Sequence, residues 1–383
     1  ESANHLRYTD AMATENLSRM LRWPRRSRRN PAVPPPVPII AIGGAAITGL
    51  MLTILLMHFV PRKIEMSPTS PIHDLQSLRY PTDQSRLLEP PALDVFQAPA
   101  SGKVASALFG SARTGTDGKS RFHEGIDIAP LYREKDGRAV DSIFAIADGT
   151  VAYINRSPGN SSYGIYVVLT HQDPVGEVYS LYGHMATVES GLKEGRRIVA
   201  GQHLGRMGNT STLRIPVRRS HLHFEIGLIA NRAFARRVTS PHGLYNGLNL
   251  FGIDPIRFFR NHAQYSPAFS MANLLDTYPV AFSVALRTAR TVDFFDNYPL
   301  LWLGDGEPIG SMVIEVAESG LPLRGRPATA ADQKILGNRN SAVLKVDKDS
   351  LGRNGRHLLS GKGNQWKLTR SGREWLQSIL YLP

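Results

Sequence analysis

A 24-residue run with no acidic or basic side chain except one histidine sets the first limit on the architecture of this chain. It extends from Val37 to Val60 and reads VPIIAIGGAAITGLMLTILLMHFV. As a helix rising about 1.5 Å per residue it would reach roughly 36 Å, enough to cross the hydrocarbon core of a bilayer. We expect residues 37–60 to form a transmembrane helix. The alternatives are a helix buried in a globular core and a signal peptide, but the run is longer than a signal h-region and no small-x-small cleavage pattern precedes Pro61.

Flanking charge predicts the orientation of this helix. Lys and Arg are retained on the cytoplasmic side of a membrane. Two basic residues, Arg62 and Lys63, follow the run immediately, whereas the segment before it holds a larger basic cluster: Arg22, Arg25, Arg26, Arg28 and Arg29. We therefore expect residues 1–36 to be a basic cytoplasmic tail of a single-pass protein of the cytoplasmic (inner) membrane. Residues 61–383 then lie outside, in the periplasm or at the cell wall.

Composition narrows the chemistry of the external part. The chain has no cysteine, which excludes disulfides, a thiol nucleophile and thiolate-bound metals, so any metal site must use His and carboxylate ligands. Lys and Arg total 45 against 32 Asp and Glu, a formal charge of +13. Such an excess favours an anionic partner without identifying it, since nucleic acid, acidic lipid and an anionic cell wall all qualify.

The external part divides by its pattern into three regions. Residues 61–100 contain seven prolines and little periodicity, which predicts an extended linker. Residues 101–260 show short apolar alternations broken by Gly and Asn, typical of an antiparallel β domain. The strands expected there cover residues 142–154, 164–172, 177–185 and 221–229. Residues 271–383 predict a small α+β accessory domain that ends in a strand and a helix, with Thr369 as N-cap and Trp375, Leu376, Ile379 and Leu380 on one helical face.

Two histidine motifs stand at the ends of the β region. RFHEGIDIAP places His123 and Asp127 four residues apart, and SHLHFEIG places His221 and His223 two apart. Because side chains repeat with period two along a strand, each pair points to one face. Imidazole nitrogens and a carboxylate are donors that zinc accepts, and three protein ligands leave a fourth position for water. His184 ends another expected strand between the two motifs. A lone strand histidine is more often structural, and we assign three to that class: His171, His203 and His242.

The ordered series of motifs in residues 100–260 resembles the lysostaphin-type (LytM) zinc metallopeptidases, which hydrolyse peptide bonds of bacterial peptidoglycan. The matching segments are HEGIDIAP, FAIADGTVAYI, YGIYVVLTHQ, YSLYGHM, VESGLKEGRRIVAGQHLGRMGNT and HLHFEIG, with FGSAR and GIDPIRFF at the borders. The resemblance implies a β-sheet groove open at both ends and zinc as the cofactor. It implies that the zinc ligands are His123, Asp127 and His223, and that His184 and His221 are the catalytic histidines.

Some details depart from that family or go beyond it. The segment from Gly208 to Ser220 is longer and more basic than the usual turn before the HxH pair, and residues 230–250 read as an insertion. Arg214, Arg218 and Arg219 are candidates for contact with an acidic stem peptide, although a solvated loop explains them as well. Glu225 shares a strand face with His223 and could orient its imidazole. A plain surface or core-edge carboxylate explains it equally.

These observations predict a membrane-anchored zinc metalloendopeptidase that cuts stem peptides or cross-links of peptidoglycan. The expected partners are peptidoglycan, the membrane through residues 37–60, and an envelope protein bound by the C-terminal domain; no nucleic acid is expected. The alternative is a non-catalytic scaffold or activator that keeps the peptidase fold. An anchored nucleic-acid-binding protein rests on charge alone. Which peptide bond is cut, and which of His184 and His221 is the general base, stay open.

Overall fold

The computed structural model describes residues 73–383 apart from 115–119, 235–241, 354, 364 and 381–383. The described residues all belong to one compact unit. None of the helices in this described part has the length and apolar character needed to cross a bilayer. The predicted tail over 1–36 and the predicted transmembrane helix over 37–60 lie outside the described residues.

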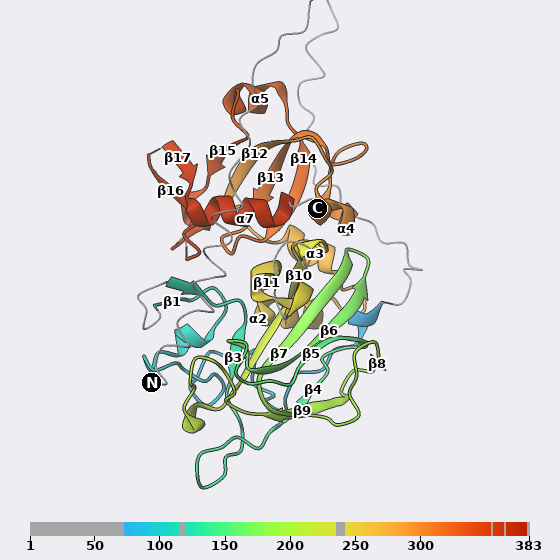
Figure 1. Ribbon diagram of the computed structural model, residues 1–383, viewed down its shortest axis with the longest axis vertical. Helices are drawn as coiled ribbons and strands as arrows, with labels where there is room; N and C mark the ends of the chain where they lie inside the picture. Colours follow the sequence, from blue (N-terminus) through green and yellow to red (C-terminus); the bar gives the residue numbers. More distant parts are fainter. Residues whose placement is uncertain (1–72, 115–119, 235–241, 354, 364, 381–383) are drawn as a thin grey trace, which may run out of the picture. The chain divides into compact units, whose positions relative to one another are not determined.

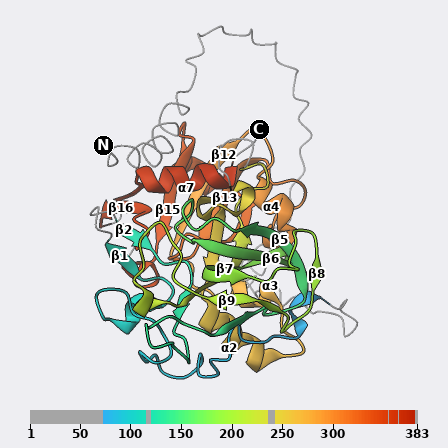
Figure 2. The same cartoon turned by 60° about the horizontal axis from the view of Figure 1, so that its bottom comes forward.

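An antiparallel sheet built from residues 126–253 forms the body of this unit (Figure 1). Its strands are β3 (Ile126–Ile128), β4 (Ser142–Phe144), β5 (Gly149–Asn155), β6 (Ile165–Asp173), β7 (Gly176–Val188), β8 (Arg197–Ile198), β9 (His203–Met207), β10 (Leu222–Ile229) and β11 (Leu250–Ile253). Their order is β11-β10-β7-β6-β5-β8, with β3 added beside β10, and β9 pairing with both β4 and β7. Figure 2 shows β5, β6 and β7 lying side by side. The mainly β, antiparallel fold expected from the sequence is confirmed.

Three of the four predicted strands match β6, β7 and β10 closely, but the strand expected over 142–154 is wrong as a single element. It divides into β4 and β5, which pair with different partners, β9 and β6. The break falls at Ala145–Asp148, where the backbone carbonyl of Asp148 accepts a hydrogen bond from His171 Nδ1 at 2.6 Å. Both strands contain buried and half-buried residues, so the pattern along the chain does not mark such a break.

The two faces of the larger sheet are covered differently. On one face Phe224 and Ile226 of β10 pack into the main core, where helix α2 (Pro255–Tyr265) contributes Phe258 and Phe259. Asp254 caps this helix by accepting hydrogen bonds from the backbone of its first turn. The opposite face carries a smaller cluster around Tyr166, Val168, Tyr179 and Leu181. Because strand residues alternate, His223 and Glu225 lie on this second face.

Residues 73–100, predicted as part of an extended linker, contain little regular structure but pack against the sheet. The short 3₁₀ helix η1 spans Asp74–Gln76, and Asp74 accepts hydrogen bonds from Arg197 and from the backbone of Gln172. Leu75, Leu87, Val95 and Phe96 are fully buried in the main core. A second 3₁₀ helix, η2 (Val104–Ala107), precedes the hairpin of β1 (Ala112–Thr114) and β2 (Ser120–Phe122).

The C-terminal segment contains a second antiparallel sheet with helices on both faces. Its strands follow the order β14-β13-β12-β15. Their bounds are β12 (Phe282–Thr288), β13 (Gly310–Val316), β14 (Pro322–Pro327) and β15 (Ser341–Val346), and the strands β16 (Leu359–Lys362) and β17 (Gln365–Leu368) form a separate hairpin. The helices are α3 (Met271–Asp276), α4 (Asp293–Asn297), α5 (Ala330–Leu336), α6 (Lys348–Leu351) and α7 (Arg370–Leu380).

Helices α5 and α7 cover opposite faces of this second sheet. Trp375, Leu376 and Ile379 of α7 join the main core, whereas Leu336 of α5 packs with Ala285 and Val313 on the other face. Thr369 Oγ1 accepts a hydrogen bond from the backbone N–H of Gly372, so the N-cap and the buried face predicted for the last helix are confirmed. The remaining 3₁₀ turns are η3 (Val217–Arg219), η5 (Gly243–Tyr245), η6 (Gly247–Asn249) and η7 (Pro299–Leu301).

Candidate metal and catalytic site

Neighbouring strands bring the five predicted site residues together. Asp127 on β3 lies directly opposite His223 on β10, and His223 lies opposite Gly183 of β7, next to His184. His123 follows the end of β2, and His221 precedes β10 and forms an isolated bridge with Gly208. All five residues are at most 8 % exposed. Antiparallel pairing therefore joins residues that are up to 100 positions apart in the sequence.

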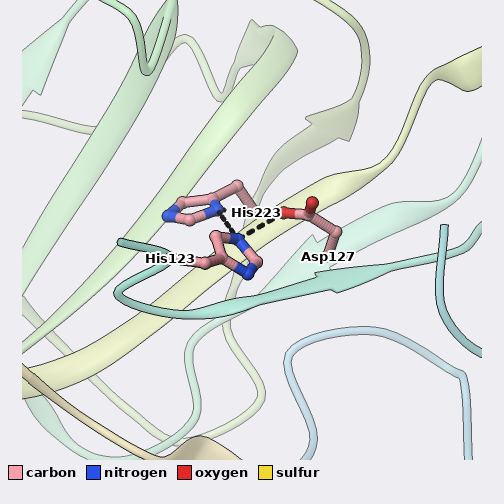
Figure 3. Close-up of side chains that lie close together, drawn as sticks. All are labelled: His123, Asp127 and His223. Carbon is pink, nitrogen blue, oxygen red and sulfur yellow. Dashed lines mark hydrogen bonds and ion pairs between the residues drawn. The ribbon is translucent and has the colours of Figure 1, made fainter. Parts of the chain in front are cut away.

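The three predicted metal ligands present one donor atom each to a common point (Figure 3). His123 Nε2 lies 3.0 Å from Asp127 Oδ1 and 3.1 Å from His223 Nδ1, and His223 Nδ1 lies 3.0 Å from the same Asp127 oxygen. Protein nitrogen and oxygen ligands lie about 2.0–2.2 Å from zinc, so two ligands of one ion can be no more than about 4 Å apart. The donor set and its spacing fit such an ion.

The ionisation states of these residues follow from burial and from their mutual contacts. Burial lowers the pKa of His123, although Asp127 opposes the shift. For Asp127, burial acts to raise the pKa, but His123 and His221 outweigh it and hold the pKa well below its usual range. Burial also acts to lower the pKa of His223, yet hydrogen bonds to Asp127 and Glu225 raise it to about 9. An ionised Asp127 thus stands beside a neutral His123 and, without metal, a protonated His223.

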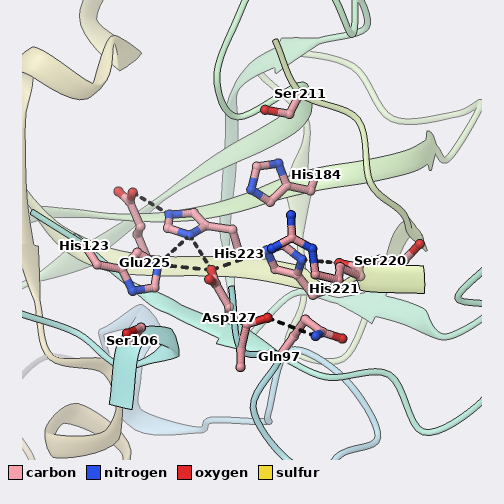
Figure 4. A network of polar contacts seen from close by, with 12 residues as sticks. Gln97, Ser106, His123, Asp127, His184, Ser211, Ser220, His221, His223 and Glu225 are labelled. Carbon is pink, nitrogen blue, oxygen red and sulfur yellow. Dashed lines mark hydrogen bonds and ion pairs between the residues drawn. The ribbon is translucent and has the colours of Figure 1, made fainter. Parts of the chain in front are cut away.

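The other two histidines, His184 and His221, stand beside the metal-ligand cluster (Figure 4). The Nδ1–H of His184 donates to the carbonyl of Thr210 at 2.9 Å, and that of His221 donates to the carbonyl of Arg219 at 2.7 Å. Each ring therefore keeps its Nε2 unprotonated when neutral, and His221 Nε2 lies 3.5 Å from Asp127 Oδ1. The two ring centroids are 4.8 Å apart. Burial, followed by the nearby His221 and His223, holds the pKa of His184 well below its usual range.

Glu225 has a specific set of partners, which favours the orienting role over a surface carboxylate. Its Oε1 lies 2.8 Å from His223 Nε2, and it accepts hydrogen bonds from the hydroxyls of Tyr163 and Tyr179 at 2.9 and 3.0 Å. Glu225 is fully buried. With Nε2–H donated to Glu225, His223 presents Nδ1 to the metal-ligand cluster. The two tyrosines were not predicted, because they belong to segments far from Glu225 in the sequence.

Arg113 is a further site residue that sequence analysis missed. It lies on β1, within the FGSAR segment that the resemblance used only as a domain border. Its Nη2 donates to Asp127 Oδ2 at 2.6 Å and lies 3.0 and 3.2 Å from the two ring nitrogens of His123. The sequence FGSAR does not indicate a contact between Arg113 and the site. The contact arises because β1 pairs with β2, which leads into His123.

The two departures from the family pattern lie near the site. In the segment from Gly208 to Ser220, Arg214 and Arg218 are exposed, while Arg219 supplies the carbonyl that orients His221. The described part of the insertion packs on the sheet face that carries Tyr166 and Tyr179. There Tyr245 stacks on Tyr153 with ring centroids 5.9 Å apart.

The three histidines assigned to a structural class lie outside the metal-ligand cluster. His171 in the sheet and His242 in the insertion are buried, and each is hydrogen-bonded to a backbone carbonyl. His203 pairs with Glu189 at 3.0 Å. Their separation from the cluster agrees with the assignment made from single, unpaired positions.

Comparisons with known proteins support the family resemblance. Residues 121–234 match the family model described as Peptidase family M23. Among curated proteins, the chain is similar to the lipoprotein NlpD/LppB homolog of Pseudomonas aeruginosa, with 32% identity over 137 residues. That match covers 36% of this chain, and it spans only about 37% of the length of the lipoprotein.

Two solved structures are among those that match. A zinc-containing peptidase from Vibrio cholerae is 22% identical with a TM-score of 0.27, and the match covers 40% of this chain and 37% of the peptidase. The catalytic domain of lysostaphin from Staphylococcus simulans is 20% identical with a TM-score of 0.27, and the match covers 40% of this chain and 89% of that domain. The family match and the motifs above show that residues 121–234 of this chain contain a domain that matches peptidase family M23.

Proposed function

We propose that this chain is a membrane-anchored zinc metalloendopeptidase that hydrolyses peptide bonds in the stem peptides or cross-links of bacterial peptidoglycan. The observation that carries the proposal is the convergence of His123, Asp127 and His223 within about 3 Å of one another, with His184 and His221 beside them. This cluster lies within the part of the chain that matches the peptidase family. The anchor is residues 37–60, which would place the site in the periplasm or at the wall.

Zinc would be held by His123 Nε2, Asp127 Oδ1 and His223 Nδ1. When bound there, zinc supplies Lewis acidity, which polarises a carbonyl and makes a water molecule more acidic. Three protein donors leave room for such a water molecule or for substrate, as catalytic zinc sites require. Glu225 holds the proton of His223 Nε2, so that the other ring nitrogen stays available.

His184 and His221 perform the proton transfers. Each donates Nδ1–H to a backbone carbonyl, so each can accept a proton at Nε2. A low pKa keeps His184 neutral near pH 7 and able to accept the proton of an attacking water molecule. Once protonated, either ring can donate to the negative charge that develops on the scissile carbonyl oxygen or to the departing amine.

The test is metal analysis of the purified full chain, combined with digestion of purified peptidoglycan and mass spectrometry of the fragments. We expect one zinc per chain and fragments with a new amine terminus. His123→Ala and Asp127→Ala should lose both zinc and hydrolysis. His184→Ala and His221→Ala should keep zinc and lose at least about 100-fold in rate, since acid–base catalysis contributes roughly 10²–10⁴.

His203→Ala is the matched control, because this histidine is partly exposed and pairs with Glu189 away from the cluster. Its zinc content and rate should equal those of the unaltered chain. Stoichiometric zinc without any cleavage would contradict the endopeptidase and favour a scaffold or activator that keeps the peptidase fold. Undiminished hydrolysis by His184→Ala would contradict the role given to that histidine.

A further inference from the structure

A guanidinium group lies against the metal-ligand cluster without any role in the mechanism above. Arg113 is on β1, opposite Arg121 of β2, and β2 leads directly into His123. The Arg113 side chain is 28% exposed, whereas Asp127, which it contacts, is 3% exposed. The hairpin therefore brings a cation from the surface onto a buried carboxylate.

The two oxygens of Asp127 have separate partners. Oδ1 lies 3.0 Å from both His123 Nε2 and His223 Nδ1, the two nitrogens of the metal-ligand cluster. Oδ2 accepts a hydrogen bond from Arg113 Nη2 at 2.6 Å. A charge-assisted bond of this length is among the stronger hydrogen bonds in proteins. The carboxylate is thus held in one rotation, with a single oxygen facing the histidines.

Arg113 makes this contact without occupying the ligand position of His123. Its Nη2 lies 3.0 Å from Nδ1 and 3.2 Å from Nε2 of that ring. The in-plane bonding directions of the two nitrogens diverge, so one atom cannot lie along both, and Nη2 contacts the ring itself. His123 Nδ1 has its own partner, the carbonyl of Leu108 at 3.0 Å, which leaves Nε2 for a metal.

The backbone fixes the position of the guanidinium. The carbonyl of Ser106, on η2, accepts hydrogen bonds from both Nε and Nη2 of Arg113, the former at 2.7 Å. The planar fork of arginine lets one side chain bond this carbonyl and the Asp127 carboxylate together. A lysine has one nitrogen at the end of a flexible stem and cannot hold both contacts in the same way.

We propose that Arg113 is a positioning residue that keeps Asp127 a one-oxygen metal ligand. Carboxylates bind metals through one oxygen or through both. If Asp127 bound through both, its second oxygen would become a fifth ligand beside the water or substrate that a catalytic zinc site binds. By holding Oδ2, Arg113 keeps the ion four-coordinate. The inference rests on the proposed metal-dependent function but concerns coordination, not hydrolysis.

Cobalt(II) is the probe for this inference, because its visible absorption distinguishes four ligands from five. The full chain, Arg113→Gln and Arg113→Lys would each be loaded with cobalt, and zinc affinity would be measured by competition with a chelator. We expect the unaltered chain to show the strong absorption of a four-coordinate ion. Arg113→Gln should show the weaker absorption of five coordination and bind zinc about 10–100-fold less tightly, the usual loss when a group that orients a ligand is removed.

Arg86→Gln is the matched control, because Arg86 also bonds carboxylates, those of Glu89 and Asp94, but on the surface. It should match the unaltered chain. Arg113→Lys keeps a cation for Oδ2 and should recover part of the affinity and the four-coordinate absorption. Circular dichroism and the melting temperature would verify that each variant is folded.

An unchanged cobalt spectrum and zinc affinity in folded Arg113→Gln would overturn the assignment, as would Arg113→Lys behaving like Arg113→Gln. If the unaltered chain bound no cobalt or zinc, this inference and the proposed function would both fail. Metal binding with the expected spectra but no cleavage of peptidoglycan would refute the proposed hydrolysis and leave the role of Arg113 supported.

Discussion

At the scale of single residues, the site is defined by how hydrogen bonds distribute protons among its histidines. In His184 and His221 the Nδ1–H group donates to a backbone carbonyl, and this bond fixes the tautomer of each ring. His223 lies between two carboxylates instead, with Nδ1 at 3.0 Å from Asp127 and Nε2 at 2.8 Å from Glu225. This arrangement explains why histidines of one buried cluster have opposite pKa shifts.

Metal binding should depend on pH through His223. Below its pKa of about 9 the metal-free site holds a proton on Nδ1, which a metal must displace, whereas Asp127 is ionised and His123 neutral. Loss of one proton per ion makes the apparent zinc affinity rise about tenfold per pH unit from about pH 7 to 9. Chelator competition at several pH values measures this slope. A flat profile would show that His223 is already deprotonated.

A second prediction at this scale concerns Tyr179, whose hydroxyl bonds Glu225 at 3.0 Å. Burial and the nearby Glu225 raise the pKa of Tyr179 well above its usual range, so the hydroxyl remains a donor. Tyr179→Phe leaves a fully buried carboxylate with one donor fewer and should lower the free energy of unfolding by about 1–3 kcal/mol.

Urea denaturation of the full chain gives the comparison, with Tyr132→Phe as control, because Tyr132 is 67% exposed. The control should unfold like the unaltered chain. Equal stability of both variants would mean that Tyr179 does not stabilise the Glu225 carboxylate.

At the scale of elements, a β-bulge directs His184 into the site. Ile165 pairs with Met185 and Val167 with Tyr182, so β7 has one residue more than β6 between these pairs. His184 lies in this stretch with φ of +59°, a left-handed conformation that is rare for residues other than glycine. The neighbouring loop then supplies the carbonyl of Thr210 that orients its ring.

Gly164 provides a test of this local architecture. It has φ of +65°, and a Cβ atom there would lie 2.0 Å from the carbonyl oxygen of Thr210, the acceptor for His184. Gly164→Ala should lower the free energy of unfolding by about 2–4 kcal/mol through backbone strain and overpacking. Displacement of Thr210 should also reduce hydrolysis by more than any loss of folded protein explains.

Gly159→Ala is the control in the same loop, since a Cβ atom at Gly159 would have no heavy atom within 4 Å. It should keep the stability and the rate of the unaltered chain. The measurements are urea denaturation and the initial rate of peptidoglycan digestion. If Gly164→Ala matched Gly159→Ala in both, the loop would not be positioning Thr210 for His184.

At the scale of the whole described unit, several hydrogen bonds and an ion pair join the C-terminal segment to the larger sheet and to the residues that flank it. Tyr298, after α4, accepts a hydrogen bond from the backbone N–H of Ile229 and donates one to the carbonyl of Glu177. On the other side, Arg356 forms an ion pair with Glu124, the residue that follows His123. The main core is shared by both parts. The segment predicted as an accessory domain therefore has direct contacts with the residues that flank the site.

The contribution of this junction can be measured with Tyr298→Phe. Tyr298 is fully buried, so loss of its hydroxyl leaves a backbone donor and a backbone acceptor without their partner. The free energy of unfolding should fall by about 1–3 kcal/mol or more, because unsatisfied buried groups are costly. Urea denaturation measures the change, and Tyr132→Phe again serves as control. A loss below about 0.5 kcal/mol would show that the two parts are not held together here.

The sequence alone determined the elements whose information is local. Alternating apolar residues predicted β6, β7 and β10, and the capping threonine and apolar face predicted α7. The spacing of His123 with Asp127 and of His221 with His223 was enough to propose a metal site. The period-two argument holds for His221 and His223 at the start of β10, but His123 and Asp127 are separated by the break between β2 and β3. The resemblance added His184 and the identity of the metal.

Only the tertiary structure decided which other groups surround these residues. Arg113, Tyr163 and Tyr179 reach the site through strand pairing and loop packing between segments far apart in the sequence, and no local pattern records such contacts. The division of residues 142–154 into β4 and β5 likewise depends on partner strands and on His171. Local periodicity specifies which face a side chain takes, whereas long-range pairing specifies what it meets there.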